Sequence, residues 1–76
     1  MKRIRINLDT RNDALELVCA AASLPDEEIY ISDTTGHLRV HARSVMGVLY
    51  SMEFKDLWLE TENDYYHIFK NFYAGE

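Results

Sequence analysis

The sequence has few of the residues that cross-link or interrupt small folds. It contains one cysteine, one proline and three glycines among 76 residues. A single cysteine cannot form an internal disulfide, so a hydrophobic core must hold the fold together. Cys19 lies in the apolar run 17–22. We therefore expect a buried thiol, in a protein of a reducing compartment.

Long apolar runs and clusters of basic residues are also missing. No apolar run has the length that crosses a bilayer, and residues 1–5 (Met-Lys-Arg-Ile-Arg) lack the apolar core of a signal peptide. Eight Lys and Arg face thirteen Asp and Glu, which gives a net charge of −5. Binding to a phosphate backbone needs clustered positive charge. These features predict a soluble cytoplasmic protein that binds neither membranes nor nucleic acid directly.

Motifs of common catalytic sites are absent from the sequence. It has no Ser-His-Asp or Cys-His pattern, no glycine-rich phosphate loop and no zinc signature. His37 and His41 fall on one face of an expected strand, without cysteine or carboxylate at ligand spacing. We expect them to face solvent. The sequence thus predicts no enzyme, no metal site and no cofactor.

Alternation of apolar and polar residues predicts four half-buried strands. A turn at residues 33–36 joins the second strand to the third in a hairpin. The inward residues in chain order are Ile4, Ile6 and Leu8; Ile29 and Ile31; Leu38, Val40 and Ala42; Leu57 and Leu59.

Helical spacing and capping residues predict three helices between and after these strands. The first starts with Asp9 or Thr10 as N-cap, with Asp13 completing a box-like spacing, and runs to about Ser23, before Pro25. Its expected inward residues are Ala14, Leu15, Val18, Ala21 and Ala22.

The second helix follows Ser44, a good N-cap residue. Helical spacing turns Val45, Val48, Leu49 and Met52 inward and leaves Met46 and Tyr50 toward solvent. Asn63 or Asp64 caps the last helix, with an apolar stripe of Tyr65, Ile68, Phe69 and Phe72.

The element order is β-α-β-β-α-β-α in a single domain, 1–76. Strands with one apolar face favour an antiparallel sheet, and all three helices must then cover the same face. We predict a two-layer α+β sandwich. On its open face we expect Tyr30, Trp58, Arg3, Arg5, Arg39, His37 and His41. Trp58 stacks on arginines there, or marks a dimer or partner patch; the chain is a monomer or a weak dimer.

Two segments resemble HPr, the phosphocarrier of the bacterial phosphoenolpyruvate-dependent sugar phosphotransferase system. Residues 42–49, Ala-Arg-Ser-Val-Met-Gly-Val-Leu, are similar to the regulatory-serine segment of Gram-positive HPr proteins. Residues 8–11, Leu-Asp-Thr-Arg, resemble the family's phosphorylation segment, in which histidine follows leucine. The resemblance implies a sheet with strand order 1-4-2-3. It also implies phosphotransferase-system proteins, HPr kinase or a catabolite-control regulator as partners.

Asp9 takes the place of the family's phospho-accepting histidine, beside Thr10 and Arg11. Asn12 replaces the family's proline and Asn7 a frequent glycine. Three interpretations remain open at Asp9: a plain N-cap, a permanent partial imitation of the phosphorylated site with Arg11, or an unusual phosphate acceptor.

Ser44 matches the serine that HPr kinase phosphorylates in the family, and Arg43 would stabilise the added charge. Its other interpretation is a cap alone. We expect Arg11, Arg43, Ser44, Met46, Gly47 and Tyr50 to bind partners. The sequence thus favours a regulatory, HPr-like protein that carries no phosphate on histidine. The alternatives are a phosphotransfer component with an unusual acceptor, or a diverged interaction module unrelated to sugar transport.

Overall fold

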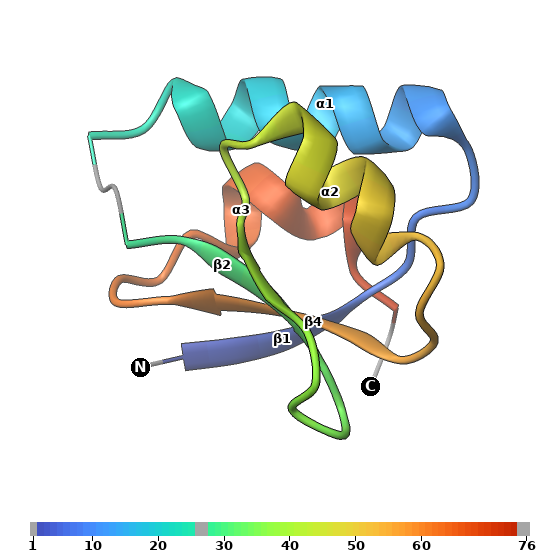
Figure 1. Cartoon of the computed structure of the whole chain (residues 1–76). Coiled ribbons are helices and arrows are strands. Elements are labelled where there is room, and N and C mark those ends of the chain that lie inside the picture. Colours follow the sequence, from blue (N-terminus) through green and yellow to red (C-terminus); the bar gives the residue numbers. More distant parts are fainter. Residues whose placement is uncertain (1, 26–27, 75–76) are drawn as a thin grey trace.

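The computed structural model describes residues 2–25 and 28–74. It has two layers, a four-stranded antiparallel sheet and helices packed on one of its faces (Figure 1). The elements in chain order are β1 (Lys2–Ile6), α1 (Arg11–Ala22), β2 (Tyr30–Asp33), β3 (Arg39–His41), α2 (Val45–Ser51), β4 (Leu57–Thr61), α3 (Tyr66–Phe69) and the 3₁₀ turn η1 (Lys70–Phe72). The strand order β1-β4-β2-β3 confirms the α+β architecture predicted from the sequence.

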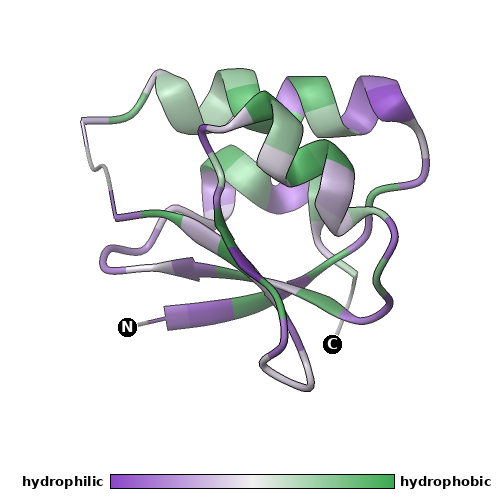
Figure 2. Cartoon of the chain, viewed as in Figure 1, coloured by the Kyte–Doolittle hydropathy of each residue, from purple (hydrophilic) through white to green (hydrophobic). Residues whose placement is uncertain are grey.

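Strand alternation places one row of each strand in the core. Ile4 pairs with Leu59, and Leu59 with Ile31, which in turn pairs with Val40. Ile31 and Leu59 are fully buried beneath the helices. In Figure 2 hydrophobic (green) and hydrophilic (purple) residues both occur along the strands and helices, as expected of elements with one buried face. Leu8 was predicted as part of the first strand, but it lies beyond the end of β1 and is half-buried.

The hairpin between β2 and β3 turns at Gly36, whose φ of 82° lies in the left-handed region that favours glycine. The Asp33 carboxylate accepts hydrogen bonds from the Thr35 hydroxyl (2.5 Å) and the Leu38 amide (3.0 Å). These bonds, the Thr35 bond first, lower the pKa of Asp33 below its ordinary value. His37 was expected within a strand, but it lies in this turn, before β3 begins.

The buried stripe of α1 differs from the prediction. Its buried residues are Ala14, Leu17, Val18 and Ala21, at the i, i+3, i+4, i+7 spacing of one helix face. Leu15 and Ala22, predicted to point inward, are exposed because they lie off this stripe. Cys19 is exposed for the same reason, so the prediction of a buried thiol was wrong.

Two smaller corrections concern α2 and the last helix. Val48 is buried, and Leu49 and Met52 are half-buried against the core, but Val45 is 43% exposed. Val45 is the first helical residue, and it lies at the edge of the packed layer. The last helix is a short α-helix that continues as a 3₁₀ turn, although its predicted apolar stripe is packed on the core.

Candidate functional site

The start of α1 is fixed by a capping box that excludes Asp9. Thr10 is the N-cap: its hydroxyl accepts from the Asp13 amide, and the Asp13 carboxylate accepts from the Thr10 amide, each at 3.2 Å. The same carboxylate accepts the Asp9 amide at 3.1 Å. Asp9 therefore keeps its own carboxylate available at the surface, where it accepts a hydrogen bond from the side chain of Asn7 at 3.0 Å.

Arg11 does not pair with Asp9. No ion pair joins the two side chains, both of which lie in the described part of the chain. Arg11 instead lines a shallow hollow of about 400 Å³ with Leu49, Met52 and Glu53, which belong to the end of α2 and the turn after it. Arg11, the last residue of the segment 8–11, thus lies next to the end of α2.

The start of α2 carries Ser44 as predicted. Its hydroxyl oxygen accepts the Gly47 amide at 3.1 Å, while the residue remains exposed beside Arg43. Gly47 permits a close approach, because a Cβ there would lie 3.1 Å from the Cβ of Val40 in β3. Within the segment 42–49, Gly47 therefore packs closely on the sheet while Ser44 faces solvent.

Apolar side chains remain uncovered along α2. Met46 is 83% exposed and Tyr50 58% exposed, as the helical spacing predicted. Tyr50 packs edge-on against Phe54, with 5.4 Å between ring centroids. Single exposed apolar residues are ordinary, but here Val45, Met46 and Tyr50 all lie exposed on one seven-residue helix.

The two helices run antiparallel over the sheet (Figure 1). Arg11 of α1 and Leu49 of α2 line the same hollow. Because the helices run in opposite directions, Leu15, one turn after Arg11, and Val45, one turn before Leu49, lie to the same side of that hollow. We call this surface the α1–α2 face, made of Arg11, Leu15, Arg43, Ser44, Val45, Met46, Leu49 and Tyr50.

Sequence reasoning missed Leu15 and Val45, because it placed both in the core. The stripe of four buried residues in α1 excludes Leu15, but the apolar residues of this helix also allowed the stripe that the sequence predicted. The predicted residues Asp9 and Ser44 are not brought together, since the helices they precede run in opposite directions and start at opposite ends of the face (Figure 1).

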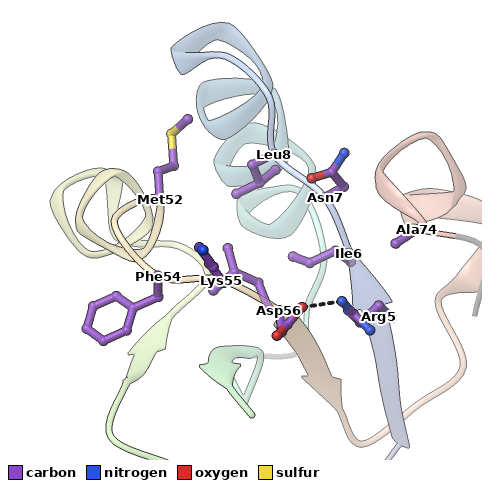
Figure 3. A pocket seen from close by; sticks show the side chains of 10 residues that line it. Arg5, Ile6, Asn7, Leu8, Met52, Phe54, Lys55, Asp56 and Ala74 are labelled. Carbon is purple, nitrogen blue, oxygen red and sulfur yellow. Dashed lines mark hydrogen bonds and ion pairs between the residues drawn. The ribbon is translucent and has the colours of Figure 1, made fainter. Parts of the chain in front are cut away.

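A second cavity, of about 400 Å³, opens beside the α1–α2 face (Figure 3). It lies between the end of β1, the loop from α2 to β4 and the C-terminal segment, and Met52 lines both hollows. An ion pair between Arg5 and Asp56 crosses its floor, below Asn7 and Leu8 in the view of Figure 3. Asp56 has a φ of 58°, an uncommon conformation for a residue other than glycine.

Neither hollow carries a histidine or cysteine. His37, His41 and His67 lie on the hairpin, β3 and α3, away from Asp9. Across residues 2–25 and 28–74, no three His, Cys, Asp or Glu side chains are placed to hold a metal ion. In the same residues no helix is long and apolar enough to cross a bilayer. The described residues offer the exposed Asp9 carboxylate, the exposed Ser44 hydroxyl and the exposed apolar side chains of the α1–α2 face.

No protein-family model, curated protein or solved structure matches this chain.

Proposed function

We propose that this chain is an HPr-like regulatory protein that binds proteins of the phosphotransferase system or of carbon-catabolite control through the α1–α2 face. The observation that carries the proposal is that Met46 and Tyr50 lie exposed on α2, the helix that Ser44 caps. The strand order β1-β4-β2-β3 and the segments 8–11 and 42–49 support the same family. The two segments carry the resemblance to HPr, and the strand order is the one that this resemblance implies.

The proposal assigns no phosphocarrier role to the protein. Asp9 replaces the family's histidine, and the chain's own histidines lie on other elements. The Asp9 carboxylate lies at the surface near a helix start, where negative charge is favourable. It would act as a fixed anion for partners that recognise the phosphorylated site, with less charge than a phosphoryl group.

Incubation with enzyme I and labelled phosphoenolpyruvate tests the non-carrier role. We expect no label on this protein while a standard HPr is labelled in the same reaction. Stable label that disappears in the Asp9→Asn variant would make the protein a carrier with an unusual acceptor.

Incubation with HPr kinase and ATP, followed by intact mass, tests Ser44. We expect the gain of one phosphate in the wild type and none in Ser44→Ala, with standard HPr modified in parallel. An unchanged wild-type mass would reject the regulatory phosphorylation.

Docking is tested by titrating enzyme I, HPr kinase and a catabolite-control regulator. Met46→Glu is expected to weaken the tightest of these complexes by about tenfold or more, because it places charge in the apolar strip. Asn71→Glu, exposed on η1, is the matched control. If none of the partners binds the wild type, the chain is an interaction module unrelated to sugar transport.

A further inference from the structure

The sheet face that no helix covers is satisfied by its own residues. Arg3 and Arg5 stack over the Trp58 ring, with their guanidinium carbons 4.9 and 5.7 Å from its centroid. This stacking is one of the two interpretations that the sequence offered for Trp58. The charges of the same arginines are paired with Glu60 and Asp56. The second cavity, between the end of β1 and the loop from α2 to β4, differs in this respect.

The second cavity is lined mainly by apolar side chains from segments distant in the sequence (Figure 3). Ile6 and Leu57 lie at its base and are buried, with 3% and 5% exposure. Leu8, Met52 and Phe54 line it while only partly buried against the core. Its volume of about 400 Å³ is that of a small-molecule site. The protein thus leaves apolar surface uncovered on several sides of one concave hollow.

Contacts between strands fix the shape of this cavity. The Asp56 carboxylate pairs with Arg5 of β1, and the Asp56 carbonyl accepts the Thr34 hydroxyl at 3.2 Å. Thr34 in turn accepts the Trp58 indole N–H at 3.0 Å. These contacts hold Asp56 in its left-handed conformation, which aspartate tolerates better than most residues. A cavity that is already formed loses little conformational freedom on binding, which favours a small ligand.

One positive charge remains available at the cavity. The charge of Arg5 is neutralised by Asp56. Lys55 also lines the cavity and is exposed, and among the residues that the structure describes no carboxylate forms an ion pair with it. In Figure 3 its side chain points toward the opening between Met52 and Leu8. A single cation therefore lies beside the apolar walls.

We propose that the second cavity binds a small organic monoanion, a carboxylate carried on an aryl or alkyl body. The carboxylate would pair with Lys55 while the apolar body covers Leu8 and Met52. Inorganic phosphate would bring no apolar contact, and a neutral apolar molecule would leave the ammonium without a partner. Asp9 and Glu53, acidic residues of the adjoining segments, do not line the cavity.

Titration of the ¹⁵N-labelled chain with 3-phenylpropionate, followed by NMR, tests the site. We expect saturable shifts at the amides of residues 5–8, 52–57 and 74, with a dissociation constant of about 10 mM or lower. 3-Phenylpropanamide keeps the apolar body without the charge. It is expected to bind about three- to fivefold more weakly, the contribution of an exposed ion pair. Acetate keeps the charge without the body and should give no saturable shift at the same concentrations.

The variant Lys55→Gln removes the charge and keeps a polar side chain. We expect it to bind 3-phenylpropionate about three- to fivefold more weakly. Its binding of 3-phenylpropanamide should be unchanged, whereas a distorted cavity would weaken both. Lys70→Gln, on η1, makes the same charge change away from the cavity and should bind both compounds as the wild type does.

The absence of saturable shifts at concentrations well above the expected dissociation constant would overturn the proposal. Equal affinity for the acid and the amide would overturn it as well, and this comparison needs no variant to fold. Shifts centred on Tyr66 and Tyr73 would place the binding elsewhere, and equal weakening by Lys55→Gln and Lys70→Gln would indicate charge attraction without a site. The inference is independent of the proposed function, because none of these outcomes bears on docking at Met46.

Discussion

At the residue scale, single polar side chains terminate the elements of this fold. Thr10 and Ser44 accept the amides of residues three positions later, and Asp33 accepts the Leu38 amide across the hairpin turn. Asn63 or Asp64 was expected to cap the last helix, but the N-cap of α3 is Tyr65, and the Asp64 carboxylate accepts the Tyr66 amide at 3.1 Å from the position before the cap. Caps act over three or four residues, which explains why the sequence predicted Ser44 and narrowed the cap of α1 to Asp9 or Thr10, of which the structure shows Thr10.

Asp33 gives stability a defined pH dependence. Its pKa is lower in the folded chain than the ordinary value of about 3.9 in the unfolded chain. Its stabilisation is therefore complete above pH 4 or so and is lost as pH falls through the lowered folded pKa. We expect Asp33→Asn to be less stable than wild type near neutral pH and the difference to shrink in acid.

Urea unfolding near pH 7 and near pH 3 measures this difference. Glu53→Gln removes an exposed carboxylate and should follow the wild type at both pH values. A gap between wild type and Asp33→Asn that is the same at both would show that the carboxylate charge is not responsible.

At the element scale, the sequence predicted which segments form helices and which face of each strand is buried. It predicted less well which face of a helix packs on the core. Most residues predicted to point inward from the strands are buried, because period-two alternation leaves only one choice of face. These are Ile6, Ile29, Ile31, Leu38, Ala42, Leu57 and Leu59. In α1, apolar residues surround much of the helix, so the sequence allowed more than one stripe. The packed face includes Leu17 and excludes Leu15. That rotation is set by contact with the sheet and α2, which no local pattern contains.

Gly47 sets how closely α2 packs on the sheet. Gly→Ala within a helix normally gains about 1 kcal/mol in propensity. Here the new Cβ would lie 3.1 Å from the Val40 Cβ and 3.3 Å from the Ser44 hydroxyl oxygen. Because a Cβ on β3 cannot move aside without the backbone, we expect overpacking to outweigh the gain. The net loss should be about 1 kcal/mol in the free energy of unfolding.

Chemical denaturation of Gly47→Ala measures that loss. Met46→Ala, at the preceding and largely exposed position, should stay within about 0.5 kcal/mol of wild type. A Gly47→Ala protein that is more stable than wild type would contradict the close approach.

At the scale of the whole molecule, the C-terminal segment closes the fold against its first strand. The Asn7 amide donates to the Phe72 carbonyl at 2.8 Å, and the Ala74 amide donates to the Arg5 carbonyl at 2.9 Å. Tyr73 forms an isolated bridge with Ile6. Phe72 is 8% exposed and packs in the core, so residues near the two ends of the chain share one hydrophobic layer.

Phe72→Ala should therefore affect the whole fold. Replacing a buried phenylalanine by alanine typically lowers the free energy of unfolding by about 3–5 kcal/mol. That is a large share of the roughly 5–15 kcal/mol typical of a native protein. We expect a strongly lowered thermal midpoint, or an unfolded protein at room temperature.

Calorimetry or circular dichroism melting measures the midpoint. Tyr73→Ala removes the exposed neighbour and should change stability much less. Equal losses in the two variants would mean that the C-terminal segment acts through its surface contacts rather than through the buried ring.

The sequence by itself determined the element order, the core face of each strand and the cap of α2, and it limited the cap of α1 to Asp9 or Thr10. These depend on alternation and on contacts a few residues apart. The tertiary structure alone decided the rotation of α1, the exposure of Cys19 and Val45, and the break of the last helix into a short α-helix and a 3₁₀ turn. It also decided that Arg11 adjoins α2 and that tyrosines from the chain's end complete a groove with β1. Such neighbours are distant in sequence, and only packing of the elements brings them together.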